Sequence, residues 1–468
     1  MVETTGVYFE AYNYVLKTLQ STNPSALPFE KYLAPSPDNL ALVSSLTREI
    51  ALIEGPPGTG KTVVGVEIMK VLLAEENRKA KIGPILTICF TNHALDQFLE
   101  HLLDEKITNI VRLGSRTKSE KIKGFSLEEI HQEFIVNLSN LQRRHDEKRK
   151  EMCDIYDEGS RRALLSSDVI GMTTNGAAKF QNLIRSIGPR IIICEEAGEV
   201  LEAHILSALT PSTQHIILIG DPNQLRPKLA TYSLSMDSLL GKNYQLDKSL
   251  FERLIRGDKA VKLEKAQLLT QRRMRKEEIS DLIRYTLYRN GENTAVYRNL
   301  IDGENTAKYP NIRGAQHNVY FIDHRRPEDD SGDEFAMQSH ANTYEVQMVV
   351  EMVKYFVRNG YNKPDDIAVL TPYLGQMIKI RDALAESFVV TLRTVDNFQG
   401  EEANIVIVSL VRNYSESGND SIGFLKSPNR SNVLLSRARQ GMFLIGNSEL
   451  MASKSDMWAR VIEILPNC

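Results

Sequence analysis

Short apolar runs alternate with stretches of helical periodicity along most of this 468-residue chain. Aliphatic runs without internal polar alternation are typical of strands buried on both faces of a parallel sheet. In the first half they fall at Ile50–Ile53, Ile85–Phe90, Ile110–Leu113, Val169–Met172, Ile191–Cys194 and Ile216–Ile219. In the second half they fall at Val319–Ile322, Ile367–Leu370, Ile405–Leu410 and Met442–Ile445, with helices over Asn342–Arg358, Gln376–Glu386 and Asn429–Ala438. The pattern predicts an α/β fold with parallel sheets.

The length of the chain and the repeated alternation of strands and helices predict two large domains. Residues 1–32 form an amphipathic helical segment expected to pack on the core, residues 33–265 a first domain, and residues 266–468 a second. Between about 118 and 162 the sequence becomes polar and charge-rich, which predicts a helical arm inserted in the first domain. The acidic stretch 326–334 is interpreted as a solvated loop whose charge needs no function.

The chemistry begins at Gly55-Pro56-Pro57-Gly58-Thr59-Gly60-Lys61-Thr62, between a predicted strand and a predicted helix. In that context the Gly-x-x-x-x-Gly-Lys-Thr spacing indicates a phosphate loop. Glycines let backbone N–H groups turn towards phosphate oxygens, and the helix N-terminus adds partial positive charge. We expect Lys61 to reach the β- and γ-phosphates and the Thr62 hydroxyl to ligate Mg²⁺. The residues expected to form the cradle are Gly55, Pro56, Gly58, Thr59 and Gly60.

Two acids, Glu195 and Glu196, end the buried-type strand at 191–194, where α/β sheets place their ligands. One carboxylate is expected to support Mg²⁺ and the next to orient the attacking water, although adjacent acids there also suit a helix N-terminus. Gln224 follows the next strand and can sense a γ-phosphate or that water. Arg273 and Arg437 lie beyond the first sheet and are candidate arginine fingers.

The amino-acid composition excludes few classes of protein. The apolar fraction is 42%, the charged fraction is 25% and the net charge is −3, so any nucleic-acid surface must be a local patch. The four cysteines form no C-x-x-C pair, and Cys89 and Cys194 lie in apolar runs where core packing is expected. Neither a signal peptide nor an apolar run of membrane-spanning length is seen, which predicts an intracellular protein without membrane association.

Taken in order, these elements resemble the superfamily-one helicases, more narrowly the up-frameshift-like RNA helicases and the NFX-type zinc-finger-containing helicases. The resemblance covers about Tyr8 to Leu450. Its most specific blocks are Thr91–Phe98, Gly171–Ala178, Val395–Glu402 and Asn429–Gly441. Each block alone is a weak signal, and their occurrence in family order is a strong one.

The resemblance implies two RecA-like domains that bind ATP and Mg²⁺ between them and hold single-stranded nucleic acid across their tops. It assigns Lys61 and Thr62 to phosphate and Mg²⁺, Glu195 to the metal, Glu196 to the general base, Gln224 to the γ-phosphate, Arg273 and Arg437 to the fingers, and Glu402 to the ribose. It places Asn92, Thr173 and Thr371 where such helicases grip the sugar–phosphate backbone, a contact that carries no sequence preference.

It further implies an RNA helicase or translocase with 5′→3′ movement, RNA or DNA as the strand, and a role near RNA silencing or surveillance in the nucleus or cytoplasm. An RNA-directed RNA polymerase or another silencing factor is the partner expected by analogy. Because both arginine motifs are in cis, a monomer is expected.

The chain departs from the family pattern at four points. The usual Asp-Glu pair is Glu195-Glu196, the adenine-reading glutamine falls on or near Asp38, and Arg272 replaces an aromatic residue that often stacks on adenine. Aspartate accepts a hydrogen bond but cannot donate one, so base selectivity is expected to be weak. The zinc fingers and the small barrel of the family are missing, which suggests a helicase core, excised or naturally minimal.

Two other classes stay open. Asn362-Lys363-Pro364-Asp365 resembles the guanine-reading motif of GTPases, but it precedes a predicted strand instead of ending one, so a turn is the favoured interpretation. An RNA clamp or scaffold whose ATP site gates binding is the second alternative, and Glu195 is the feature that favours it.

Overall fold

The computed structural model describes residues 50–73, 84–114, 117, 119–127, 157–229, 231–236, 238–257, 263, 265–288, 300–329, 339–384, 388–414 and 421–465. The expected N-terminal helix at 1–32, Asp38 and most of the expected helical arm lie outside these residues. The chain divides into two compact units. The first comprises residues 1–55, 61–222 and 226–267, and the second comprises 56–60, 223–225 and 268–468.

The first unit is built on a seven-stranded parallel sheet with strand order β3-β4-β2-β5-β6-β1-β7. The strands are β1 (Ile50–Glu54), β2 (Ile85–Cys89), β3 (Ile110–Leu113), β4 (Val169–Thr173), β5 (Ile191–Cys194), β6 (His215–Gly220) and β7 (Lys265–Gln267). All six strands predicted for this half are confirmed. The edge strand β7 was not predicted, because Lys-Ala-Gln carries no apolar run.

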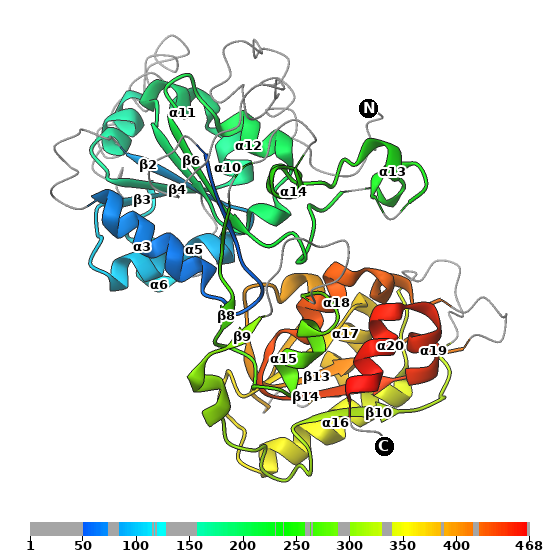
Figure 1. Ribbon diagram of the computed structural model, residues 1–468. Coiled ribbons are helices and arrows are strands. Elements are labelled where there is room, and N and C mark those ends of the chain that lie inside the picture. The colour runs from blue at the N-terminus through cyan, green and yellow to red at the C-terminus, as the bar shows by residue number, and fades with distance from the viewer. Residues whose placement is uncertain are drawn as a thin grey trace, which may run out of the picture. The chain divides into compact units, whose positions relative to one another are not determined.

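Helices cover both faces of this sheet (Figure 1). One group comprises α3 (Lys61–Leu73), α5 (Asn92–Asp104) and α6 (Glu120–Lys123), and the other comprises α10 (Thr174–Lys179), α11 (Gln181–Ile187), α12 (Glu202–Ala208) and α14 (Leu250–Arg256). The unit also contains α13 (Gly241–Tyr244) and the 3₁₀ turns η2 (Ala197–Glu199) and η3 (Tyr232–Leu234). Two covered faces explain why the strands read as continuous apolar runs.

The second unit has a five-stranded parallel sheet of order β10-β14-β13-β11-β12. Its strands are β10 (Val319–Asp323), β11 (Ile367–Thr371), β12 (Thr391–Thr394), β13 (Ala403–Ser409) and β14 (Ala438–Gly446), with a separate pair β8 (Thr270–Gln271) and β9 (Ile301–Asp302). Its helices are α15 (Ile279–Arg284), α16 (Thr343–Arg358), α17 (Leu374–Ala383), α18 (Pro428–Leu435), α19 (Ser448–Lys454) and α20 (Asp456–Ile464), with 3₁₀ turns η4 (Glu304–Lys308), η5 (Val395–Asn397) and η6 (Gly423–Lys426).

Alternate residues of β13 enter two separate cores. Ile405 and Ile407 pack with the apolar side of α16, whereas Val406 and Val408 pack in the cluster that contains Trp458 of α20. This alternation follows from the two-residue period of a strand that has a helical layer on each face. Both units are therefore parallel-sheet α/β units of the RecA-like P-loop type predicted from the sequence.

One interpretation of the sequence is wrong for Glu328. Glu328 belongs to the stretch read as a solvated acidic loop, but its carboxylate pairs with Arg412 at 2.8 Å and with His340 at 2.7 Å. These partners lie 84 and 12 positions away, so spacing along the chain could not show them. They hold the pKa of Glu328 below its usual range, although its partial burial opposes this.

Candidate nucleotide-binding and nucleic-acid-binding sites

The predicted phosphate loop joins β1 to α3. Gly58 and Gly60 have φ angles of +73° and +82°, a left-handed conformation that glycine adopts without strain. Within the loop, the Thr59 hydroxyl donates to the Pro56 carbonyl at 2.8 Å. The two glycines and this short bond fold the loop back ahead of the helix. α3 begins directly after the loop, and the N-terminus of a helix favours a bound phosphate.

Lys61 is the first residue of α3 and is 7% exposed. Its ammonium group donates to the Gly55 carbonyl at 3.0 Å. This bond holds the charged end of the Lys61 side chain near the start of the loop that is expected to bind phosphate. A β- or γ-phosphate oxygen would offer this ammonium group a stronger, charge-assisted partner than a carbonyl.

The Thr62 hydroxyl donates to Oε1 of Glu195 at 2.7 Å, across 133 positions of sequence. Glu195 directly follows β5 and is 2% exposed, and its second oxygen, Oε2, has no hydrogen-bond partner among the described residues. Burial, and then the neighbouring charge of Glu196, raise the pKa of Glu195 to about 7. An unpartnered carboxylate oxygen beside a hydroxyl is a donor set that suits Mg²⁺. These residues fit the ion assigned to them from the sequence.

Glu196 differs from Glu195 in its backbone. Its φ is +51°, in the left-handed region that non-glycine residues seldom occupy. It is half-buried, and within the described residues no hydrogen bond to its carboxylate is formed. Backbone strain of this kind clusters at functional sites. The two acids thus differ in their contacts: the Glu195 carboxylate is bonded to Thr62, and the Glu196 carboxylate accepts no hydrogen bond among the described residues.

The cysteines beside this site are packing residues. Cys89 and Cys194 are both fully buried, and burial raises the pKa of each thiol above its ordinary range. A buried neutral thiol is a poor nucleophile. The expectation of core packing is confirmed.

The two arginines predicted as fingers, Arg273 and Arg437, both lie in the second unit, and their surroundings differ. Arg273 pairs with Glu402 and is 15% exposed, and Arg439 approaches the same carboxylate at 3.4 Å. Arg437 is 1% exposed and donates to the Val433 carbonyl at 2.9 Å. Glu402, expected from the sequence to meet the ribose, therefore serves here as an arginine partner. Gln224 is 3% exposed.

The predicted nucleic-acid contacts of the first unit lie at helix starts. Asn92 is the first residue of α5, and its side-chain oxygen accepts a hydrogen bond from Arg112 at 2.9 Å. Thr173 caps α10, where its hydroxyl accepts from the Gly176 N–H at 3.1 Å. In the second unit, Thr371 is 0% exposed, and its hydroxyl is 3.4 Å from the Tyr373 nitrogen.

Arg112 was missed from the sequence. It is completely buried within β3 and pairs with Asp96 of α5 at 2.7 Å. Because a guanidinium carries only donors, the Asn92 oxygen must face it, and the Asn92 amide NH₂ is left to point elsewhere. The signal was an arginine inside the apolar run 110–113, since an arginine buried in a strand requires a partner.

The GTPase alternative receives no support from the turn that prompted it. Residues 362–365 precede β11, and the Lys363 N–H donates to Asp366 at 2.9 Å. The segment is the turn favoured in the sequence interpretation. Among the described residues, no helix has the length and apolar character needed to cross a membrane.

The chain is similar to two family models and to several known proteins. Family models described as an AAA domain match residues 38–230 and 246–449. The mouse NFX1-type zinc finger-containing protein 1 is 38% identical over 304 residues, which are 64% of this chain and 14% of that protein. The Schizosaccharomyces pombe protein named Helicase required for RNAi-mediated heterochromatin assembly 1 is 28% identical, with 100% of this chain and 67% of that protein covered. The ATP-dependent helicase upf1 of the same yeast is 27% identical, with 89% and 45% covered.

A parallel sheet with this phosphate loop and these strand-end acids is typical of the P-loop nucleoside triphosphatases. The chain belongs to the superfamily-one helicases, in the up-frameshift-like group that includes the NFX1-type zinc finger-containing proteins. It spans 14% and 16% of the length of the mouse and human NFX1-type proteins.

Proposed function

We propose that this chain hydrolyses ATP with Mg²⁺ and uses the energy to move along single-stranded RNA or DNA. The observation that carries the proposal is the bond between Thr62 and Glu195. It leaves one buried carboxylate oxygen, near Lys61, without a hydrogen-bond partner in the part of the chain that the structure describes. A buried carboxylate without compensation is costly. A divalent cation bound to ATP would compensate it.

In this proposal the residues divide the work of phosphoryl transfer. Lys61 and the loop N–H groups bind the phosphates, and Thr62 and Glu195 hold Mg²⁺, which would neutralise charge on the β- and γ-phosphates. Glu196 orients a water for attack on the γ-phosphorus and accepts its proton. The bond from that phosphorus to the bridging oxygen breaks, so that ADP and phosphate leave. Gln224, Arg273 and Arg437 are proposed to respond to the γ-phosphate, as the family pattern implies.

The nucleic-acid part of the proposal rests on the family and on the group at Asn92. A fixed amide NH₂ at a helix start is suited to donate to a phosphate oxygen, and such contacts hold a strand without reading its sequence. One relative is named as a helicase required for RNAi-mediated heterochromatin assembly, and another is named as the ATP-dependent helicase upf1. We accordingly place the activity in RNA silencing or surveillance, as a 5′→3′ monomer in the nucleus or cytoplasm. A silencing factor such as an RNA-directed RNA polymerase is the proposed partner class.

A second candidate is an ATP-gated clamp that binds RNA without unwinding it. Glu195 favours this candidate, because its side chain is one methylene longer than the aspartate usual in helicases. Strand release from a duplex with a single-stranded 5′ overhang separates the two. ATP-dependent release supports the helicase, and ATP-dependent affinity without release supports the clamp.

The primary test measures ATP turnover with and without single-stranded RNA or DNA, in the wild type and Lys61→Ala. Lys70→Ala is the matched control, because Lys70 lies on the same helix and is exposed. We expect turnover stimulated by nucleic acid, lost in Lys61→Ala and kept in Lys70→Ala. Equal turnover in all three proteins would refute the assignment.

A further inference from the structure

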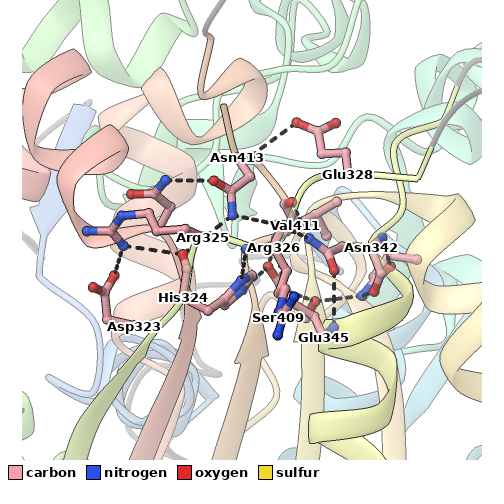
Figure 2. A network of polar contacts seen from close by, with 12 residues as sticks. Asp323, His324, Arg325, Arg326, Glu328, Asn342, Glu345, Ser409, Val411 and Asn413 are labelled. Atoms are coloured by element: carbon pink, nitrogen blue, oxygen red, sulfur yellow. Dashed lines mark hydrogen bonds and ion pairs between the residues drawn. The ribbon is translucent and has the colours of Figure 1, made fainter. Parts of the chain in front are cut away.

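A buried polar network lies at the carboxyl ends of β10, β13 and β14 in the second unit (Figure 2). At its centre is Glu345, in the first turn of α16 and 0% exposed. Its carboxylate accepts the Ser409 hydroxyl, the Val411 N–H and the His324 imidazole. A fully paired buried carboxylate fixes the groups around it. The network therefore locks three separate segments at one edge of the sheet.

One of those segments is strained. Val411, just beyond β13, has a φ of +70°, which is an outlier for a β-branched residue. Its N–H lies 3.1 Å and 3.0 Å from the two Glu345 oxygens. Such a conformation persists only where the surroundings impose it. Glu345 thus holds the chain in the turn that carries it into Arg412 and Asn413.

The same network fixes the backbone of Arg326. Its N–H donates to Nδ1 of His324 at 3.2 Å, and its carbonyl accepts from Asn413 at 2.6 Å and from Asn342 at 3.2 Å. Because Nδ1 of His324 accepts, the ring carries its proton on Nε2, which donates to Glu345. Two segments distant in sequence, at Asn342 and Asn413, together with the neighbouring His324, therefore hold one exposed residue in place (Figure 2).

The two neighbouring arginines of this edge differ in how they are used. Arg325 pairs with Asp323 at 2.5 Å and with Glu449 at 3.5 Å. Arg326 is also exposed, its guanidinium carbon lies 5.8 Å from the centre of the Tyr344 ring, and it forms no ion pair within the described residues. The fold thus immobilises the backbone of the arginine that has no ion-pair partner in the described part of the chain.

We propose that Arg326 binds a phosphate of the single-stranded nucleic acid. Its rigid backbone lowers the entropy cost of binding, and its planar fork matches phosphate oxygens. Tyr414, which is 39% exposed, directly follows Asn413, so an aromatic residue lies close in the chain to the group that holds Arg326. Basic groups beside exposed aromatics are typical of single-strand sites. Thr371, the contact expected from the sequence at this edge, is buried instead.

The inference rests on the proposed function, so its test measures binding and not turnover. Fluorescence anisotropy of labelled single-stranded oligouridylate is followed at several salt concentrations for the wild type, Arg326→Ala, Arg326→Lys and Arg325→Ala. Arg325→Ala is the matched control, because it removes the same charge from the neighbouring exposed position. We expect Arg326→Ala to weaken binding by about three- to fivefold. The slope of log affinity against log salt should fall by about 0.7.

Arg326→Lys should keep most of that slope, because its charge remains, and Arg325→Ala should stay within about twofold of the wild type. Equal losses in Arg326→Ala and Arg325→Ala would show a general charge effect and overturn the inference. Wild-type affinity in Arg326→Ala would overturn it too, while leaving the proposed function intact. A wild type that hydrolyses ATP but binds no oligouridylate or oligodeoxythymidylate would refute both.

Discussion

The Thr62 hydroxyl donates a 2.7 Å hydrogen bond to Oε1 of Glu195, which joins the first turn of α3 to the end of β5. The bond links the last residue of the phosphate-loop motif to the acid that follows β5. A hydroxyl and a carboxylate already in contact need little rearrangement to share a cation. Metal binding at this site is therefore open to direct test.

Glu195→Gln should weaken ATP binding in the presence of Mg²⁺ while leaving metal-free ATP binding nearly unchanged. The amide keeps the shape but removes the charge that the cation would meet. Loss of a partner of this kind typically costs about 10–100-fold in metal affinity. Titration of a fluorescent ATP analogue with Mg²⁺ and with EDTA measures the difference, and Glu67→Gln, exposed on α3, is the control. An unaltered Mg²⁺ dependence would exclude Glu195 from the metal site.

Glu196→Gln should bind ATP but turn it over about 10²–10⁴-fold more slowly, because an amide cannot accept the proton of the attacking water. Its carboxylate forms no hydrogen bond among the described residues, so its replacement should leave the thermal midpoint unchanged. Single-turnover hydrolysis and a melting curve check the two halves of the prediction. Wild-type turnover would show that another group is the base.

Arg273→Ala and Arg437→Ala should separate chemistry from folding. Arg437 is buried and bonded to the Val433 carbonyl, so its removal should lower both turnover and the stability of the second unit. Arg273 is partly exposed, so its removal should lower turnover, by roughly 10³-fold for a finger, with little loss of stability. The fluorescence of Trp458, the single tryptophan, reports unfolding of the second unit. Full turnover in both variants would remove the finger role.

Arg112→Met should destabilise the first unit by about 3–5 kcal/mol, because it leaves Asp96 buried without its charge partner. Adding Asp96→Leu should recover most of that loss, since replacing both charges by apolar groups is often nearly neutral. The double variant should still bind single-stranded RNA less tightly, because Asn92 has lost the donor that orients its amide. Denaturant melts and anisotropy measure the two effects. Full RNA affinity in the double variant would show that Arg112 is structural only.

His204, on α12, gives a prediction for pH. Burial lowers its pKa from 6.5 to about 4, so between those values the unfolded chain binds a proton that the folded chain does not. Stability should therefore be fully present above pH 6.5 and fall as the pH drops towards 4, by up to about 3 kcal/mol. His204→Gln should lose much of this dependence, whereas His317→Gln, exposed in the second unit, should keep it. Hydrogen exchange of the β6 amides at each pH measures it, and parallel wild-type and His204→Gln curves would contradict it.

The sequence by itself determined the sheets, the phosphate loop and the acids. Doubly covered strands such as β5 and β13 must be continuous apolar runs, and the glycines at 58 and 60 are required by their positive φ. Polar edge strands could not be predicted in this way. For example, β12 (Thr-Leu-Arg-Thr) is only partly buried and contains no apolar run.

Only the tertiary structure decided which polar groups meet. Thr62 and Glu195, Arg112 and Asp96, and Glu345 and Val411 are separated by 133, 16 and 66 positions, and no periodicity connects them. The same holds for Thr371, which was expected to contact nucleic acid and is buried, and for Arg326, which lies in the stretch read as a solvated loop and is exposed but held by Asn413. Apolar burial is encoded locally by the period of each element. A polar contact depends on the direction of two side chains that only the assembled sheet brings together.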